Sequence, residues 1–151
     1  MMTESLADAS TDASESLYAR LGGETVLRQF VNRLYSFMDE DASVAPVRRM
    51  HSENLSYASD RLFMFLSGML GGPPLYMEAF GHPRLRQKHL HFSIGDEERD
   101  QWMLCAQHAA DQLDIEDALR DELIGVLARM ADHLRNKGPQ ARPCGPPKNM
   151  S

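Results

Sequence analysis

Apolar residues recur at helical spacing through most of this chain, and that pattern restricts its fold more than any other feature. Between Glu24 and Met38, one face carries Leu27, Phe30, Val31, Leu34 and Met38, a period of about 3.6 residues. Similar patterns run through 54–70, 96–113 and 117–136, and no segment alternates polar and apolar residues as a half-buried strand would. The sequence therefore predicts an all-α fold with about five longer helices and short connecting pieces.

The helix predicted at 54–70 carries apolar residues on more than one side. One broad stripe is formed by positions 58, 62, 65, 66 and 69, and Phe63 widens it. A helix with this pattern is buried against more than one neighbour. The sequence Gly71-Gly72-Pro73-Pro74 then ends it. The segment around Pro46 and residues 75–80 are predicted to be connections.

Composition and charge restrict the class of protein. The 151 residues suit one domain, and a hydrophobic fraction of 42% is high enough for a real core. A net charge of −6 argues against a nucleic-acid binder, and no apolar run reaches the ~18 residues of a membrane span. The predicted domain spans 17–136, between disordered tails at 1–16 and at the Gly/Pro-rich residues 137–151.

The termini and the cysteines indicate a compartment. Residues 1–16 lack the hydrophobic core of a signal peptide. Cys105 and Cys144 are too few and too far apart for a disulfide framework, and neither belongs to a CxxC pair. The expected location is therefore the reducing cytoplasm.

Histidines and cations are concentrated in residues 81–92. The histidines are His82, His89 and His91, and the cations are Arg84, Arg86 and Lys88. Pro83 suits the first position of a helix, so we predict a short helix from Pro83 to about His89. A planar cofactor with a metal centre and acidic edges needs this combination of imidazole, apolar side chains and cations. The alternative is a basic, solvated helix with surface histidines.

Two aromatic residues place polar groups on predicted inner faces. Tyr35 follows Leu34 on the apolar face of its helix, and Trp102 lies on the same face as Ala106. A buried tyrosine hydroxyl or indole N–H must find a partner. For Tyr35 the alternative is a structural tyrosine bonded to a backbone carbonyl. At the start of the Trp102 helix, Asp96 is the predicted N-cap.

Several of these motifs occur together in one known family. They are Phe63-Met64-Phe65-Leu66-Ser67-Gly68, Gly71-Gly72-Pro73, Gly81-His82-Pro83-Arg84-Leu85-Arg86, His89 and Glu98-Arg99-Asp100-Gln101-Trp102. In this combination the chain resembles the group II truncated haemoglobins from Leu17 to Leu134. The resemblance implies a two-over-two α-helical sandwich around haem b, with a haem iron.

The resemblance also implies roles for individual residues. His89 matches the proximal histidine that holds the iron, and Tyr35 and Trp102 match distal residues. His51 matches a third distal position, with Met50 as the alternative because of a length change near Pro46. The remaining matches are Ala58 beside the ligand and, around the haem ring and its propionates, Leu62, Phe65, Tyr76, Arg84, Arg86, Lys88 and Phe92.

Two positions depart from the common family pattern. Met69 stands where many relatives have an aromatic residue. Lys88 stands where arginine is frequent, so a propionate there would meet a point charge and no bidentate fork. Arg48, Arg49 and Arg61 are predicted to be solvated surface residues.

The resemblance implies reversible binding of dioxygen, and of other diatomic gases such as NO and CO, at a pentacoordinate haem. Dioxygen as a ligand carries partial negative charge, which donors from Tyr35, Trp102 and His51 would stabilise in an apolar pocket. The alternative is a redox enzyme at the same haem, a nitric oxide dioxygenase or a peroxidase-like protein, served by a reductase. A cofactor-free helical interaction domain would not explain why these residue types occur together. Neither nucleic acid nor membrane is an expected partner, and the protein is expected to be a monomer or homodimer.

Overall fold

A computed structural model describes residues 15–90, 92 and 94–136, and over these residues the chain is helical without strands. The elements in order are α2 (Leu17–Leu21), α3 (Gly23–Glu40), the 3₁₀ helix η1 (Ala42–Val44), α4 (Ala45–Arg49), α5 (Ser56–Met69), α6 (Leu75–Phe80), α7 (Leu85–Lys88), α8 (Asp96–Asp111) and α9 (Asp117–His133). The predicted all-α class is confirmed. Residues 1–14 and 137–151 of the predicted tails, which include Cys144, lie outside the described residues, and so does His91. Ser16, predicted to belong to the N-terminal tail, is instead the N-cap of α2.

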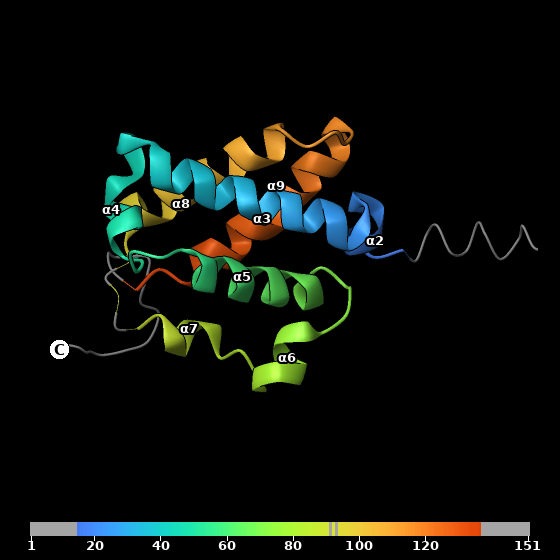
Figure 1. Ribbon diagram of the computed structural model, residues 1–151, viewed down its shortest axis with the longest axis horizontal. Coiled ribbons are helices and arrows are strands. Elements are labelled where there is room, and N and C mark those ends of the chain that lie inside the picture. Colours follow the sequence, from blue (N-terminus) through green and yellow to red (C-terminus); the bar gives the residue numbers. More distant parts are fainter. Residues whose placement is uncertain (1–14, 91, 93, 137–151) are drawn as a thin grey trace, which may run out of the picture.

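Two helix pairs, α3 with α5 and α8 with α9, form the body of the molecule. Helix α3 packs against both α5 and α8, and α8 packs against α9, which gives the two-over-two arrangement seen in Figure 1. The short helices α6 and α7 lie beyond α5 in the same view. The described chain has four long helices, α3, α5, α8 and α9, where the sequence predicted about five.

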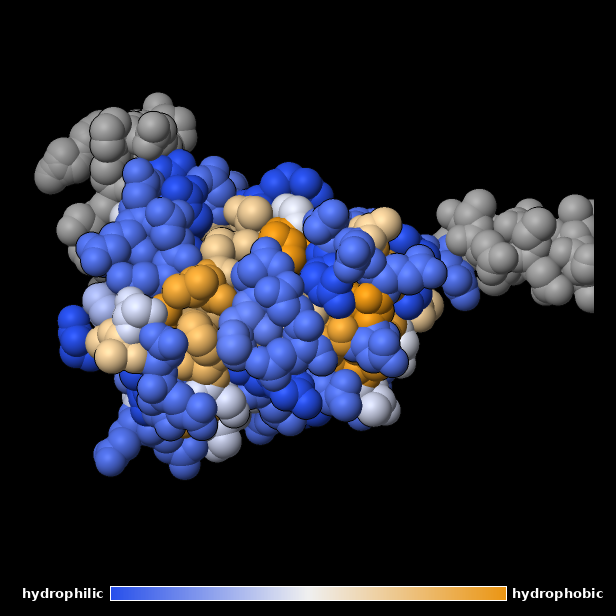
Figure 2. Space-filling view, turned by 90° about the horizontal axis from the view of Figure 1, so that it is seen from above, coloured by the Kyte–Doolittle hydropathy of each residue, from blue (hydrophilic) through white to orange (hydrophobic). Residues whose placement is uncertain are grey.

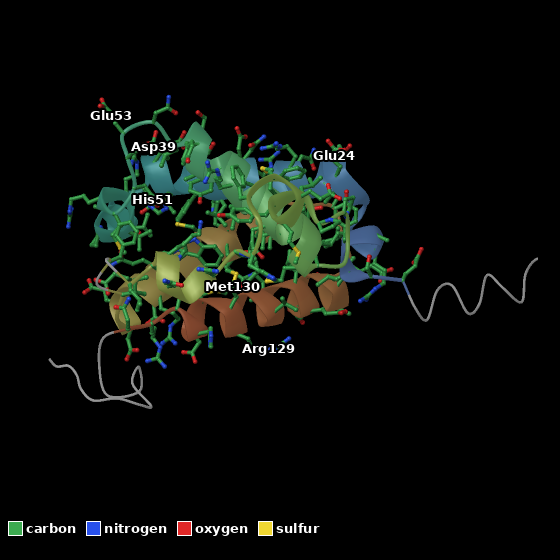
Figure 3. All side chains as sticks on the ribbon, turned by 90° about the horizontal axis from the view of Figure 1, so that it is seen from below. Glu24, Asp39, His51, Glu53, Arg129 and Met130 are labelled. Atoms are coloured by element: carbon green, nitrogen blue, oxygen red, sulfur yellow. The ribbon has the colours of Figure 1, made fainter. Side chains whose placement is uncertain are left out.

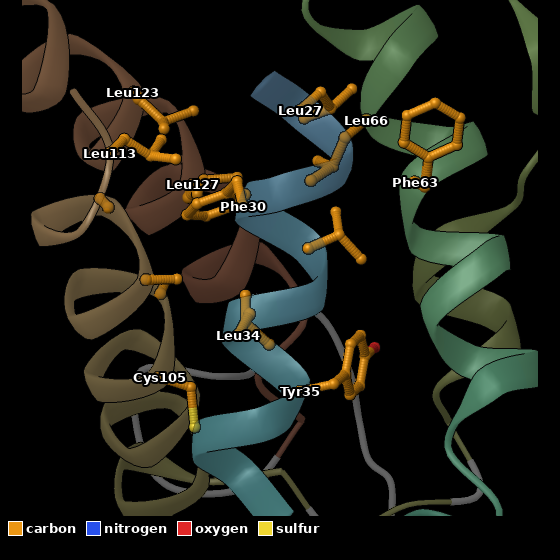
Figure 4. Packing of buried hydrophobic residues seen from close by; sticks show 14 of the residues in the cluster. Leu27, Phe30, Leu34, Tyr35, Phe63, Leu66, Cys105, Leu113, Leu123 and Leu127 are labelled. Carbon is orange, nitrogen blue, oxygen red and sulfur yellow. The ribbon is translucent and has the colours of Figure 1, made fainter. Parts of the chain in front are cut away.

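The core lies where α3 meets the other long helices. Its fully buried side chains include Phe30, Leu34, Leu66, Leu123 and Leu127, several of which are labelled in Figure 4. Burying each such side chain stabilises the fold by about 1.5–3 kcal/mol. Cys105, predicted to be a small core residue, is fully buried among them. On the face shown in Figure 2, hydrophobic residues occur in small areas separated by hydrophilic ones.

Helix α5 is buried on two sides, as its sequence predicted. Phe63 and Leu66 face the core, with 4% and 0% of their surface exposed. Ala58, Leu62 and Phe65 face a cavity on another side of the helix. This one helix therefore joins the core to the site.

The glycine pair that ends α5 allows close contact with the start of α2. A Cβ at Gly72 would lie 2.5 Å from the Tyr18 ring, and a Cβ at Gly71 would overlap Ser16. The φ of Gly71 is +97°, which L side chains rarely adopt. The close approach lets the Tyr18 N–H donate to the Leu70 carbonyl at 2.9 Å.

Three local predictions were wrong. Helix α7 begins at Leu85, two residues after Pro83, because Arg84 has a φ of 47° and is not helical. The N-cap of α8 is Gly95, whose N–H donates to the Glu98 carboxylate at 2.8 Å, while Asp96 is the first helical residue. The segments around Pro46 and at 75–80, predicted to be connections, form η1, α4 and α6.

Candidate cofactor site

A cavity of about 340 Å³ lies between the two helix pairs and the short helices. This volume is within the range of small-molecule sites in proteins. All four long helices contribute to its wall, together with residues around α4, α6 and α7. Most of the wall is apolar, including Val47, Leu62, Phe65, Ile94 and Leu134. Such a wall suits a flat, largely apolar group.

His89 lies on the cavity wall immediately after α7. Its backbone carbonyl accepts hydrogen bonds from the Phe92 N–H at 3.0 Å and from the Asn136 side-chain amide at 3.1 Å. The ring centroids of His89 and Phe92 are 6.2 Å apart. His89 therefore has an imidazole at the cavity and a backbone held from two directions.

Tyr35 brings a hydroxyl group to the same cavity from the middle of α3. Only 7% of Tyr35 is exposed, and burial raises the pKa of its phenol well above the usual value. The hydroxyl therefore keeps its proton. Among the described residues it has no hydrogen-bond partner, so the backbone-bonded alternative is not observed there, and Figure 4 shows its oxygen on the side facing α5.

Trp102 reaches the cavity from α8. It is half-buried, and its indole N–H also lacks a hydrogen-bond partner within the described part of the chain. An indole N–H can only donate. Tyr35 and Trp102 thus place two donors on an apolar wall.

His51 faces the cavity with a different hydrogen-bonding capacity from the one expected. Its Nδ1 lies 3.0 Å from the Val47 carbonyl, which can only accept, so Nδ1 carries the proton. Burial, chiefly, lowers the pKa of His51, with the charge of Arg48 and then of His89 acting in the same direction. The neutral ring therefore has an acceptor at Nε2, where the sequence led us to expect a donor. Its ring meets the Tyr35 ring edge-on, with centroids 5.7 Å apart.

Lys88 and Tyr76 form a polar pair on the wall. The Lys88 ammonium donates to the Tyr76 hydroxyl at 3.2 Å, and 8% of Tyr76 is exposed. Arg84, by contrast, is exposed and does not line the cavity. The side chain of Arg86 is outside the described part of the structure.

Of the other residues singled out in the sequence, some line the cavity and others do not. Ala58, Leu62, Phe65 and Phe92 line the cavity, and so does Met50, the alternative to His51. Met69 does not. It lines a smaller neighbouring hollow of about 250 Å³ together with Met64 and Met77.

Two arginines on the wall were missed by sequence reasoning. Arg61 was expected in solvent, but its guanidinium lies 4.1 Å from the Tyr57 ring centroid and 4.0 Å from that of Phe80. The spacing of Tyr57 and Arg61, four residues apart on one helix, was an available signal. Arg99 lines the cavity while its guanidinium pairs with Asp132 at 2.6 Å, a partner 33 residues away. Met130 was expected to face inward and reaches the cavity from the α9 side, with His51 on the α4 side (Figure 3).

The residues present fit a haem. The apolar wall suits the ring, the His89 imidazole suits iron, and the Lys88 ammonium suits a carboxylate. Tyr35 lines the cavity and its hydroxyl has no hydrogen-bond partner among the described residues, so a polar ligand inside the cavity would supply one. The observed donor set therefore agrees with a haem that carries a small polar ligand.

Known proteins share this sequence and fold. The chain matches the bacterial-like globin family over residues 16–136. It is 36% identical over 115 residues to the group 2 truncated hemoglobin YjbI of Bacillus subtilis, which covers 76% of this chain and 85% of that protein.

Solved structures show the same relation. The cold-adapted truncated hemoglobin of the Antarctic marine bacterium Pseudoalteromonas haloplanktis is 36% identical, with a TM-score of 0.79 over 82% of this chain and 100% of that chain. The group II 2-on-2 hemoglobin of the plant pathogen Agrobacterium tumefaciens is also 36% identical, with a TM-score of 0.78 over 82% of this chain and 95% of the other.

Helices packed two over two around an apolar cavity with a histidine on its wall define a truncated globin. The chain belongs to the bacterial-like globin family, and its relatives are group II truncated haemoglobins, as its motifs predicted. Membership of this family implies a haem cofactor and haem-based gas binding. No helix in the described ranges is long and apolar enough to cross a membrane.

Proposed function

We propose that this globin binds dioxygen reversibly, together with other diatomic gases such as NO and CO, at a haem b whose iron is held by His89. When bound, the haem supplies one open coordination site for such a gas. The observation that carries the proposal is the buried Tyr35 hydroxyl, which stays protonated and lacks a partner among the described residues. A relative from Bacillus subtilis, 34% identical, is described as an oxygen-avid haemoglobin, which supports the choice of dioxygen.

The distal side chains would act on the gas by hydrogen bonding. Tyr35 and Trp102 can each donate a proton to an atom that carries partial negative charge. Dioxygen as a ligand acquires such charge and carbon monoxide acquires less, so the two donors favour dioxygen. Because the surrounding wall is apolar, these hydrogen bonds are stronger than they would be in water.

On the cofactor side, His89 would supply the nitrogen for the iron and Lys88 would meet a propionate. Tyr76 holds the Lys88 ammonium at 3.2 Å, which keeps that charge beside the cavity. Lys88 would act as a point charge, since an ammonium cannot form the paired contacts of a guanidinium. The haem would thus be held at its centre and at one edge.

Haem titration of the purified protein tests this proposal. We expect a Soret band on addition of haem and a reversible spectral change between deoxygenated and air-equilibrated samples of the reduced protein. In the His89→Ala variant haem should not be held stably unless imidazole is added. If that variant keeps haem with an unchanged spectrum, the assignment of His89 is wrong and His82 becomes the residue to test.

The acceptor nitrogen of His51 favours a second candidate function, peroxide turnover. Hydrogen peroxide brings its own protons, and a neutral Nε2 at the cavity can accept one, whereas dioxygen has none to give. His51→Leu should then slow peroxide-dependent oxidation of a dye by about tenfold or more while leaving dioxygen affinity nearly unchanged. An equal rate in both proteins would remove this candidate.

The expected setting follows from the same chemistry. A reductase would return the iron to the state that binds dioxygen. The cytoplasm suits a chain whose described cysteine, Cys105, is a free and buried thiol.

Nitrate formation from nitric oxide in the presence of dioxygen and a reductase would show dioxygenase turnover at this cavity. Sedimentation of the purified protein would distinguish monomer from homodimer.

A further inference from the structure

The end of α9 is tied to the segment that follows His89. Asn136 makes three hydrogen bonds to this segment. Its side-chain amide N–H donates to the His89 carbonyl at 3.1 Å, its side-chain oxygen accepts from the Ile94 N–H at 2.9 Å, and its backbone N–H donates to the Ile94 carbonyl at 2.8 Å. One residue thus holds both ends of residues 89–94 from a position 47 residues along the chain from His89.

Asn136 is itself held in place by its neighbour. Arg135 has 8% of its surface exposed, and its guanidinium pairs with Asp96 at 2.5 Å and with Asp132 at 2.9 Å. Asp96 begins α8 and Asp132 belongs to the last turn of α9. The two ion pairs therefore fix the end of α9 against the start of α8, with Asn136 directly after them.

Helix α7 is too short to hold His89 by itself. It has four residues, and helices of this length are not stable alone. Arg84, just before it, has a left-handed φ of 47°, a conformation that is unfavourable for a residue with a side chain. The backbone at His89 therefore depends on contacts from outside α7, and the Asn136 amide makes one of them.

We propose that Asn136 is a positioning residue for the proximal histidine. By fixing the carbonyl of His89 and the N–H of Ile94, it sets the direction of the His89 side chain toward the cofactor. The side-chain amide can do both, because its NH₂ group donates to the His89 carbonyl while its oxygen accepts from the Ile94 N–H. The inference rests on the proposed role of His89 as the iron ligand.

The Asn136→Asp variant tests the inference, because it keeps the shape and the acceptor for Ile94 but removes the donor to His89. We expect the iron–histidine stretching band of the ferrous protein, measured by resonance Raman, to shift or broaden. Transfer of haem to an excess of an apo-globin acceptor should become about tenfold faster, as expected for the loss of one hydrogen bond to the haem-binding segment. Asn32→Asp on the exposed face of α3 makes the same chemical change elsewhere and should alter neither quantity.

The outcomes separate the inference from the proposed function. If the parent protein shows an iron–histidine band that disappears in His89→Ala, but Asn136→Asp leaves both the band and haem transfer unchanged, the positioning role is wrong and the proposed function stands. If the parent takes up no haem, or if His89→Ala keeps the band, the proposed function fails and the inference fails with it. In Asn136→Ser the shorter side chain cannot reach both the His89 carbonyl and the Ile94 N–H, and no charge is added. This variant therefore distinguishes the same outcomes if Asn136→Asp does not fold.

Discussion

At the scale of single residues, Trp102 and Tyr35 place one donor each on an apolar wall. Replacing Trp102 by Phe keeps most of the volume and removes one N–H. Loss of that hydrogen bond, worth about 1–1.5 kcal/mol, should raise the dioxygen dissociation rate by roughly tenfold. Tyr35→Phe should act in the same direction, and the two effects need not add because both donors share one acceptor. Stopped-flow ligand replacement measures these rates.

Carbon monoxide is the internal control for that experiment, because it gains less from the donors. Its dissociation rate should change little in either variant. If dioxygen leaves Trp102→Phe no faster than it leaves the parent, Trp102 serves only as packing, and the donor role belongs to Tyr35.

A second residue-scale prediction concerns Cys105, whose thiol pKa is raised from 9.0 to about 12, chiefly by burial and then by the nearby charge of Asp41. Below pH 9 both the folded and the unfolded chain keep the thiol proton. Above pH 9 the unfolded chain loses it while the folded chain keeps it, so the free energy of unfolding falls as pH rises. The slope for this one group approaches about 1.4 kcal/mol per pH unit until the folded pKa is reached.

Urea unfolding at pH 8, 9 and 10 checks this slope against Cys105→Ala. The alanine variant should be less stable at pH 8 because it leaves a small void, and the difference from the parent should shrink as pH rises. Two curves that stay parallel across this range would show that Cys105 has an ordinary pKa in the folded protein.

At the scale of elements, the turn after α5 is the contact that joins this helix to the start of α2. In Gly72→Ala the new Cβ would lie 2.5 Å from the Tyr18 ring, so α2 must move and the hydrogen bond from Tyr18 to Leu70 must weaken. Overpacking of this kind costs about 1–3 kcal/mol. Thermal unfolding should therefore show a lower Tm for this variant.

Gly125→Ala is the matched control within a helix. Gly125 lies in α9, and the nearest atom to a new Cβ is the flexible end of Arg129 at 3.7 Å. Alanine in a helix is favoured over glycine by about 0.5–1 kcal/mol, so this variant should be more stable than the parent. If both variants lower the Tm by the same amount, the specific contact between Gly72 and Tyr18 is not the cause.

At the scale of the whole molecule, residues 1–15 and 138–151 lack the apolar periodicity of the predicted domain. We expect a chain from Ser16 to Lys137 to keep the haem spectrum and the dioxygen affinity of the full chain. Ser16 is retained because its hydroxyl accepts from the Ala19 N–H at 3.1 Å and caps α2. Spectra and dioxygen titrations of the two proteins provide the comparison.

A shorter chain ending at Leu134 is the informative contrast, since it removes Arg135 and Asn136. It should lose haem faster than the chain ending at Lys137 if the end of α9 holds the segment after His89. A large loss of haem in the Ser16–Lys137 chain would instead show that one of the removed segments contributes to the site.

The sequence by itself determined the helical class, the positions of the long helices and the family. Helical periodicity is a local property, since one face of a helix is set by residues three and four positions apart, and α3 and α5 therefore appear within two residues of their predicted limits. The limits of the short helices were less predictable from the sequence. No local sequence pattern predicts the left-handed φ of Arg84. Because of this φ, α7 begins at Leu85 and not at Pro83, the predicted first residue.

Only the tertiary structure decided which atoms the site offers. The sequence placed His51 at the cavity as a donor, but its bond to the Val47 carbonyl leaves an acceptor there. Arg61 was expected in solvent, and packing between Tyr57 and Phe80 keeps it on the wall. Asn136 and His89 are joined across 47 residues, a contact that exists only once α9 has folded against α8. Hydrogen-bonding roles depend on which groups meet in three dimensions, whereas helical faces depend only on neighbours along the chain.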